Sequence, residues 1–234
     1  MAVKIGVSTG VFYKYYKEND LNNMITALTN LDVDIIEILF ARPFMLDIDI
    51  TSKNKDFLKT KSVIIHGPFF HNELYNDLVY SRVLIKKLIN KCKELNALHI
   101  IMHLDLLGNV KIPEEYSHLF AFENLKKERK YTLEYLKNWI KEGNNIKISL
   151  DIGHFQNNNY SEYIPLINEI KENIVEIQLS IKEDYENFLK GNINKKYDFI
   201  KDLGAPIVLE TRPKQLSDIS ILIKNLKFWE QNGS

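Results

Sequence analysis

Residues 146–154 read IKISLDIGH, a short apolar run that ends in Asp151 and is followed by Gly153 and His154. Most of the comparable runs in the chain are continuous isoleucine, valine and leucine runs rather than alternating patterns, which is typical of parallel strands buried on both faces. The polar side chains stand at the carboxyl end of this run. The same pattern recurs along the whole chain.

Eight such runs alternate with longer, charged segments that have helical periodicity. The predicted strands are residues 3–8, 33–39, 63–66, 98–103, 119–123, 146–151, 174–179 and 207–210. The clearest predicted helices are residues 20–31, 76–95, 126–142, 161–172 and 215–229. The segments after the second and fourth strands are short or irregular, so we expect reduced helices there.

This alternation predicts a single-domain α/β protein, a (β/α)8 TIM barrel that spans residues 1–234. A doubly wound open sheet is the alternative, but that fold usually has a glycine-rich first turn. Here the first turn reads Ser8-Thr9-Gly10-Val11, and the chain contains neither GxGxxG nor GxxxxGK[ST]. We therefore expect no nucleotide cofactor.

Composition excludes several protein classes. The 31 basic and 31 acidic residues cancel, which does not favour a nucleic-acid partner. Cys92 is the single cysteine, so no internal disulfide is possible, as is usual in a reducing cytoplasm. No apolar run approaches the roughly 18–20 residues that span a bilayer, and the N-terminus lacks a signal-peptide pattern. We expect a cytoplasmic protein without membrane contact, whose oligomeric state the sequence leaves open.

Side chains able to bind a metal stand at the ends of most predicted strands. They are His66 in HGPF, His103 in IIMHLD, Glu123 in AFENL, Asp151 and His154 in LDIGH, Gln178 in IQLS and Glu210 in VLETRP. One such residue alone is more often structural, but a barrel brings all its carboxyl strand ends to one mouth. Several carboxylates there would repel one another without a cation. Imidazole and carboxylate groups without thiolate predict a divalent metal such as zinc, manganese or cobalt.

The order HGPF, H, EN, LDIGH, Q and LET resembles the xylose isomerase-like TIM barrel superfamily over nearly the whole chain. This superfamily includes sugar and sugar-phosphate isomerases and epimerases, and the endonuclease IV group (AP endonuclease family 2). The resemblance implies one divalent metal held by Glu123, Asp151, Gln178 and Glu210. Gln178 departs from the family pattern, which has histidine there. The resemblance also implies that Glu123 and Glu210 act as the catalytic acid and base.

In the endonuclease IV group, two further histidines hold a second metal, and His66, His103 and Glu123 match that set. A third metal there uses the histidine after DxG, here His154, together with an Asp-x-His pair. The chain has no Asp-x-His; Asp184-Tyr185-Glu186 stands in the corresponding loop.

The favoured hypothesis is therefore a metal-dependent isomerase or epimerase of a small sugar or related hydroxycarbonyl. In it, His66 and His154 orient substrate hydroxyls, and Arg212 binds a substrate carboxylate or phosphate. An AP endonuclease-like phosphodiester hydrolase with two or three zinc ions is the alternative. A third possibility is a non-enzymatic binding barrel that has lost metal affinity through Gln178. We interpret the charge run 126–130 as a solvated helix face rather than a nucleic-acid patch.

Overall fold

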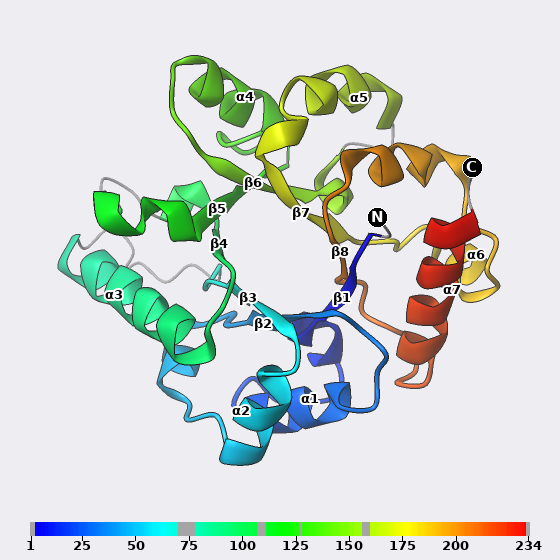
Figure 1. The fold of residues 1–234 in the computed structure, drawn as a ribbon, viewed down its shortest axis with the longest axis horizontal. Helices are drawn as coiled ribbons and strands as arrows, with labels where there is room; N and C mark the ends of the chain where they lie inside the picture. Colours follow the sequence, from blue (N-terminus) through cyan, green and yellow to red (C-terminus); the bar gives the residue numbers. More distant parts are fainter. Residues whose placement is uncertain (1–2, 70–77, 107–110, 127, 156–159, 233–234) are drawn as a thin grey trace.

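The computed structural model describes residues 3–69, 78–106, 111–126, 128–155 and 160–232. Eight parallel strands form a closed barrel in the order β1 to β8 (Figure 1). The strands are β1 (Ile5–Ser8), β2 (Ile35–Leu39), β3 (Ser62–His66), β4 (Ile100–Met102), β5 (Phe120–Glu123), β6 (Lys147–Asp151), β7 (Ile174–Leu179) and β8 (Ile207–Leu209). The predicted (β/α)8 barrel and all eight predicted strands are confirmed.

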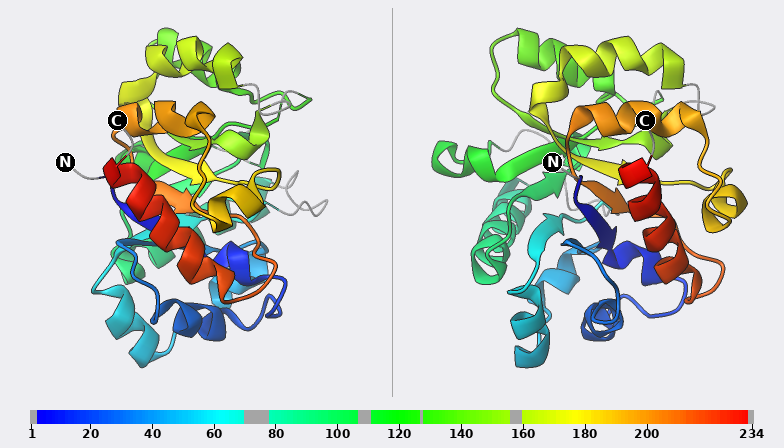
Figure 2. Two further views of the ribbon diagram at one scale, coloured as in Figure 1. Left: turned by 90° about the vertical axis from the view of Figure 1, so that its right-hand side faces the viewer. Right: turned by 45° about the vertical axis from the view of Figure 1, so that its right-hand side comes forward.

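Helices surround this barrel on the outside (Figure 1). They are α1 (Leu21–Leu28), α2 (Ser52–Leu58), α3 (Leu78–Leu95), α4 (Leu133–Lys141), α5 (Tyr160–Glu169), α6 (Tyr185–Leu189) and α7 (Asp218–Asn232). The helix predicted from residue 76 is described from Leu78 onward. In Figure 2, α7 lies alongside β1 and α6. A hydrogen bond of 2.8 Å from Val3 N to Glu230 Oε1 joins the start of the chain to α7. No helix among the described residues is long and apolar enough to cross a membrane.

The helix expected over residues 126–142 begins later than predicted. It starts at Leu133, because the side chain of Thr132 accepts a hydrogen bond from Tyr135 N and caps the helix there. The described residues of the charge run, 126 and 128–130, precede this cap and are not helical, so their interpretation as a helix face is wrong.

The fourth β/α unit contains no α-helix within its described residues. Its connection consists of the short 3-10 turns η4 (Leu104–Leu106) and η5 (Glu114–Leu119). The helix after β2 is also short, with seven residues. Both reductions were predicted. Because the described residues of the fourth unit form no α-helix, one flank of α3 lacks the usual neighbouring helix.

The barrel wall separates two apolar clusters. The larger one fills the space between the sheet and the helices. The smaller one contains four residues that lie inside the barrel: Ile35, Ile64, Ile101 and Val208. A barrel lumen is ordinarily filled by branched apolar side chains. Here the lumen positions further toward the carboxyl strand ends carry polar residues, and these build the site.

Candidate metal centre

The carboxyl ends of the strands surround a cavity of about 200 Å³ at the mouth of the barrel. Its lining residues are Gly10, Leu39, His66, Phe69, His103, Glu123, Asp151, His154, Glu210 and Arg212. Every residue singled out in the sequence for catalysis, substrate or metal binding, except Gln178, therefore lines one cavity. Prediction from strand ends was sufficient because each of these side chains closes or follows a strand.

Glu123, the last residue of β5, stands at the centre of this site and is 3% exposed. Its Oε2 lies 3.0 Å from His66 Nε2 and 2.7 Å from His103 Nε2. Its Oε1 lies 3.2 Å from His154 Nδ1. The carboxylate thus stands between two sets of side chains. His66 and His103, at the ends of β3 and β4, lie beside Oε2, and His154, which follows β6, lies beside Oε1.

Two sets of ligand atoms share this carboxylate. One set is His66, His103 and Glu123; the other is Glu123, Asp151 and His154. Within each set the ligand atoms lie within 4.8 Å of one another. Imidazole nitrogens and carboxylate oxygens at this spacing fit a divalent transition metal.

Backbone groups fix the orientation of the histidines. His66 Nδ1 lies 2.8 Å from Gly67 O, and that bond leaves Nε2 directed at Glu123. Metal-binding histidines are typically held in this way through their second ring nitrogen. A side chain at Gly67 would place its Cβ 2.5 Å from Met102 Sδ, so glycine permits β3 to end close to β4. Similarly, a Cβ at Gly153 would lie 2.6 Å from that of Ser180.

Asn124 is a supporting residue that sequence reasoning missed. Its side chain donates to Asp151 O at 2.9 Å and accepts from Asp151 N at 2.8 Å. Its carbonyl oxygen lies 2.8 Å from His154 Nδ1. These bonds tie the end of β5 to the end of β6. Its place directly after Glu123 in the EN motif was the available signal.

The site shifts the pKa values of its groups. Burial would lower the pKa of His66, but the hydrogen bond to Glu123, the charges of Glu123 and Glu37 and the hydrogen bond to Gly67 together raise this pKa to about 9. Burial would raise the pKa of Glu123, but His103 and His66 hold it well below its usual value. Burial raises the pKa of Asp151 to about 6, against the opposing charge of His154. Burial, then the charges of Glu37 and Asp151, raise the pKa of Glu210 well above normal.

Gln178 lies beneath the cavity and is fully buried. Its Nε2 donates to Glu37 Oε2 and to Glu210 Oε1, each at 3.2 Å. The side chain therefore holds two carboxyl groups, one in the lumen and one at the mouth. Its role as a metal ligand through Oε1 stays a prediction.

Arg212 and Phe69 shape the cavity wall. Arg212 is the one arginine or lysine among the residues that line it. The ring of Phe69 stacks on that of His103, with centroids 5.7 Å apart and planes at 25°. The cavity thus joins carboxylates, a cation and an apolar surface.

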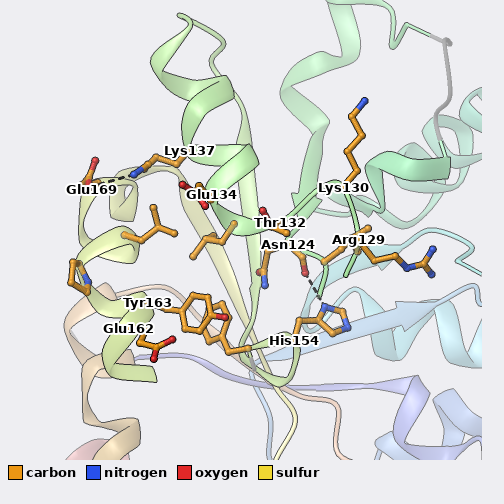
Figure 3. Close-up of a pocket in the computed structure, with 15 residues that line it drawn as sticks. Asn124, Arg129, Lys130, Thr132, Glu134, Lys137, His154, Glu162, Tyr163 and Glu169 are labelled. Atoms are coloured by element: carbon orange, nitrogen blue, oxygen red, sulfur yellow. Dashed lines mark hydrogen bonds and ion pairs between the residues drawn. The ribbon is translucent and has the colours of Figure 1, made fainter. Parts of the chain in front are cut away.

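A second, wider groove of about 690 Å³ runs between α4 and α5 (Figure 3). His154 lies at its inner end and lines both the groove and the cavity. In Figure 3, Lys137 reaches across to Glu169, whose Oε1 lies 3.7 Å from Lys137 Nζ. The groove leads outward from the candidate metal centre.

The residues considered for a third metal are engaged elsewhere. Asp184 Oδ2 lies 2.5 Å from Lys196 Nζ and accepts from the Tyr197 hydroxyl at 2.8 Å. Glu186 pairs with Lys214 at 2.5 Å. Among the described residues, no metal-spaced group of histidine and carboxylate side chains includes either.

Comparisons with known proteins give relatives by structure but not by sequence. No protein-family model matches the chain, and the search of curated proteins found no match. A D-allulose 3-epimerase from Methylomonas sp. superposes with a TM-score of 0.65 at 14% identity, over 98% of each chain. An AP endonuclease, family 2 from Brucella melitensis gives 0.64 at 12% identity, over 98% of this chain and 99% of that one. An L-ribulose 3-epimerase gives 0.63 at 15% identity, over 98% and 87%.

These similarities extend over nearly the full length of the chain, at identities that carry the fold but no activity. The chain has the fold that these proteins share, a closed (β/α)8 barrel.

Proposed function

We propose that this protein is a divalent-metal-dependent isomerase or epimerase of a small sugar, sugar phosphate or related hydroxycarbonyl compound. The observation that carries the proposal is the small cavity in which Glu123, Asp151 and Glu210 face Arg212. Its volume of about 200 Å³ is below the roughly 300–1,000 Å³ of pockets that hold drug-sized ligands, and suits a monosaccharide.

Glu123, Asp151 and Glu210 would hold the metal, with His66 and His103 as further ligands on Glu123. The bound metal supplies Lewis-acid polarisation of the substrate carbonyl. Gln178 supports this set by donating to Glu210.

Glu123 and Glu210 would be the proton-transfer groups. They follow β5 and β8, which stand three strands apart around the barrel, so they face the cavity from different sides. One carboxylate removes a proton from the carbon next to the carbonyl, and the other carboxyl returns a proton. His154 and His66 would orient substrate hydroxyls, and Arg212 would bind a substrate phosphate or carboxylate.

Solvent deuterium tests this chemistry while the substrate is still unidentified. The manganese- or cobalt-loaded protein is incubated in D2O with a panel of ketoses, aldoses and their phosphates. Incorporation of deuterium at carbon, detected by NMR, identifies the substrate. We expect Glu123→Gln and Glu210→Gln to reduce the rate by about 10²–10⁴, the usual contribution of acid–base groups.

Glu172→Gln is the matched control, because Glu172 is exposed and lies just before β7, at the opposite end of the strands. It should leave the rate unchanged. Exchange that survives both Glu123→Gln and Glu210→Gln would overturn the proposal.

A two-metal phosphodiester hydrolase is the second candidate. It is favoured by the position of Glu123, whose carboxylate stands between two sets of metal-spaced ligands. Two metals so bridged are typical of centres that cleave phosphate esters. Against it stands the zero net charge, since phosphate contacts normally require basic groups. Cleavage of an abasic-site oligonucleotide with zinc or manganese, abolished in His103→Ala, would support it.

A further inference from the structure

The flank of α3 that lacks a neighbouring helix contains a second cavity, of about 310 Å³. Its lining residues come from α3 and from the segment that leads into β5. Figure 1 shows α3 on the outside of the barrel. The residues that line it are Arg82, Ile85, Lys86, Ile89, Asn90, Lys93, Lys111, Pro113 and Tyr116. None of them lines the metal centre.

This cavity has a one-sided charge. Of the described residues that line it, four are cations, namely Arg82, Lys86, Lys93 and Lys111, and none is acidic. On the rest of α3, the cations are neutralised. Lys87 Nζ pairs with Asp47 at 2.6 Å, and Lys91 Nζ pairs with Glu94 at 2.8 Å.

The cations that face the cavity are not arranged for stability. Arg82 and Lys86 stand four residues apart on one helix face, where like charges destabilise a helix by roughly 0.2–0.5 kcal/mol. Within the described part of the chain, neither they nor Lys111 form an ion pair. An unneutralised cationic stripe on a protein with zero net charge indicates a counter-charge from outside.

The floor of the cavity is apolar and its wall is fixed. Ile85 and Ile89 are 4% and 5% exposed and form the floor. Lys93 Nζ donates to the Tyr116 hydroxyl at 3.1 Å and lies 4.4 Å from the centroid of that ring. Lys93 thus holds the aromatic wall in place, and Arg82, Lys86 and Lys111 remain at the rim.

We propose that this cavity is a binding site for a small organic anion with an apolar body. The body would lie on Ile85, Ile89 and Tyr116, and the anionic group would meet Arg82, Lys86 and Lys111. The volume is at the lower end of the range for small-molecule pockets, which suits one compact ligand rather than a polymer. The site is independent of the reaction proposed at the barrel mouth.

Fluorescence of 1-anilinonaphthalene-8-sulfonate, an aromatic sulfonate, is the probe for this site. We expect the metal-loaded protein to bind one molecule of the probe saturably. The affinity for the probe should fall at least tenfold in Lys86→Glu/Lys111→Glu. The control is Lys182→Glu/Lys190→Glu, which changes the net charge equally at two exposed residues flanking α6. Figure 1 shows α6 on the opposite side of the barrel from α3. Circular dichroism establishes that both variants are folded.

Competition then defines the ligand. Adenosine monophosphate or decanoate should displace the probe at concentrations at which inorganic phosphate does not, because phosphate lacks an apolar body. Tyr116→Ala, which leaves all four cations in place, should also lower the affinity for the probe. Equal probe affinity in the two lysine variants would overturn the site. Displacement by inorganic phosphate as readily as by the organic anions would overturn the assignment of the ligand class.

Discussion

The lumen of this barrel has two polar levels that differ in how their side chains are satisfied. At the mouth, Glu123 is contacted by three histidines and borders a cavity. Deeper inside lies the lower cluster, which we define as Glu37, His99, Ser149 and Glu176. Among the residues that the structure describes, each of its members has a buried polar atom without a hydrogen-bond partner, and so has Gln178, through Oε1, between the two levels.

The unpaired polar atoms of the lower cluster therefore lower the stability of the folded protein. A buried polar group without a partner destabilises a protein by roughly 1–3 kcal/mol. Burial and the adjacent Glu37 carboxyl raise the pKa of Glu176 well above normal. Burial, then the charge of Lys147, lowers the pKa of His99 to about 4. At neutral pH both groups are uncharged, although His99 Nε2 lies only 3.4 Å from Glu176 Oε2. The mouth is organised around charge, whereas His99 and Glu176 of the lower cluster are both neutral.

The largest effect that we expect is on metal content, which should distinguish the two sets of ligands at the mouth. Glu123 belongs to both sets of metal-spaced ligands, whereas His103 belongs to one. Glu123→Ala should therefore lose all tightly bound metal, and His103→Ala should retain the ion held by Glu123, Asp151 and His154. Elemental analysis after dialysis against zinc or manganese measures this. Equal metal content in both variants would contradict a shared carboxylate.

The pH dependence of stability tests the neutral state of His99. Its pKa in the folded protein is about 4, below the ordinary 6.5, so folding favours the neutral ring. This contribution is present above pH 6.5 and is lost as the pH falls toward 4. Between pH 7 and pH 4.5, we expect the free energy of unfolding to fall by about 2–3 kcal/mol more in the metal-free wild type than in His99→Gln. Urea unfolding at the two pH values provides the measurement.

An ion pair between His99 and Glu176 would reverse the sign of that difference. In that case the wild type would gain stability relative to His99→Gln as the pH falls. The same experiment therefore decides whether the lower cluster is neutral.

Replacing Glu176 by glutamine should stabilise the protein at neutral pH. Folding raises the pKa of Glu176, so its neutral carboxyl contributes to stability below the ordinary pKa of glutamate. This contribution is lost as the pH rises toward the raised pKa of the folded state. Glutamine cannot ionise, and its amide can donate to Glu37, which has an unpaired Oε1. We expect a gain of about 1–3 kcal/mol at pH 8 that diminishes toward pH 5. Glu172→Gln, at an exposed position just before β7, should show no change.

The sequence predicted the mouth of the barrel far better than the lower cluster, for a physical reason. His66, Glu123 and Asp151 are the last residues of short strands rich in apolar residues, so the strand pattern alone places them at one end. Closure of the barrel then brings them together. Nothing beyond a correct strand assignment was required.

The lower cluster depends on contacts that no local pattern contains. His99 and Glu176 come from β4 and β7, on different sides of the barrel, and each is a single polar residue within or beside an apolar run. The bond between Gln178 and Glu37 likewise joins residues 141 positions apart. The cationic cavity on α3 was invisible for another reason: the charges of the whole chain cancel, and a local excess appears only when the helix is folded.

The apolar level of the lumen provides the smallest effect and the reference for the two polar levels. Ile101 is fully buried and lies with Ile35, Ile64 and Val208. Ile101→Val removes one methylene group, so we expect a loss of about 0.5–1.5 kcal/mol. Because Ile101→Val removes only apolar atoms, the loss should be the same at pH 5 and pH 8, although Ile101 is the strand partner of His66. Ile221→Val, at a position 41% exposed on α7, should cost less. A pH-dependent loss in Ile101→Val would mean that the apolar level and the lower cluster form one coupled unit.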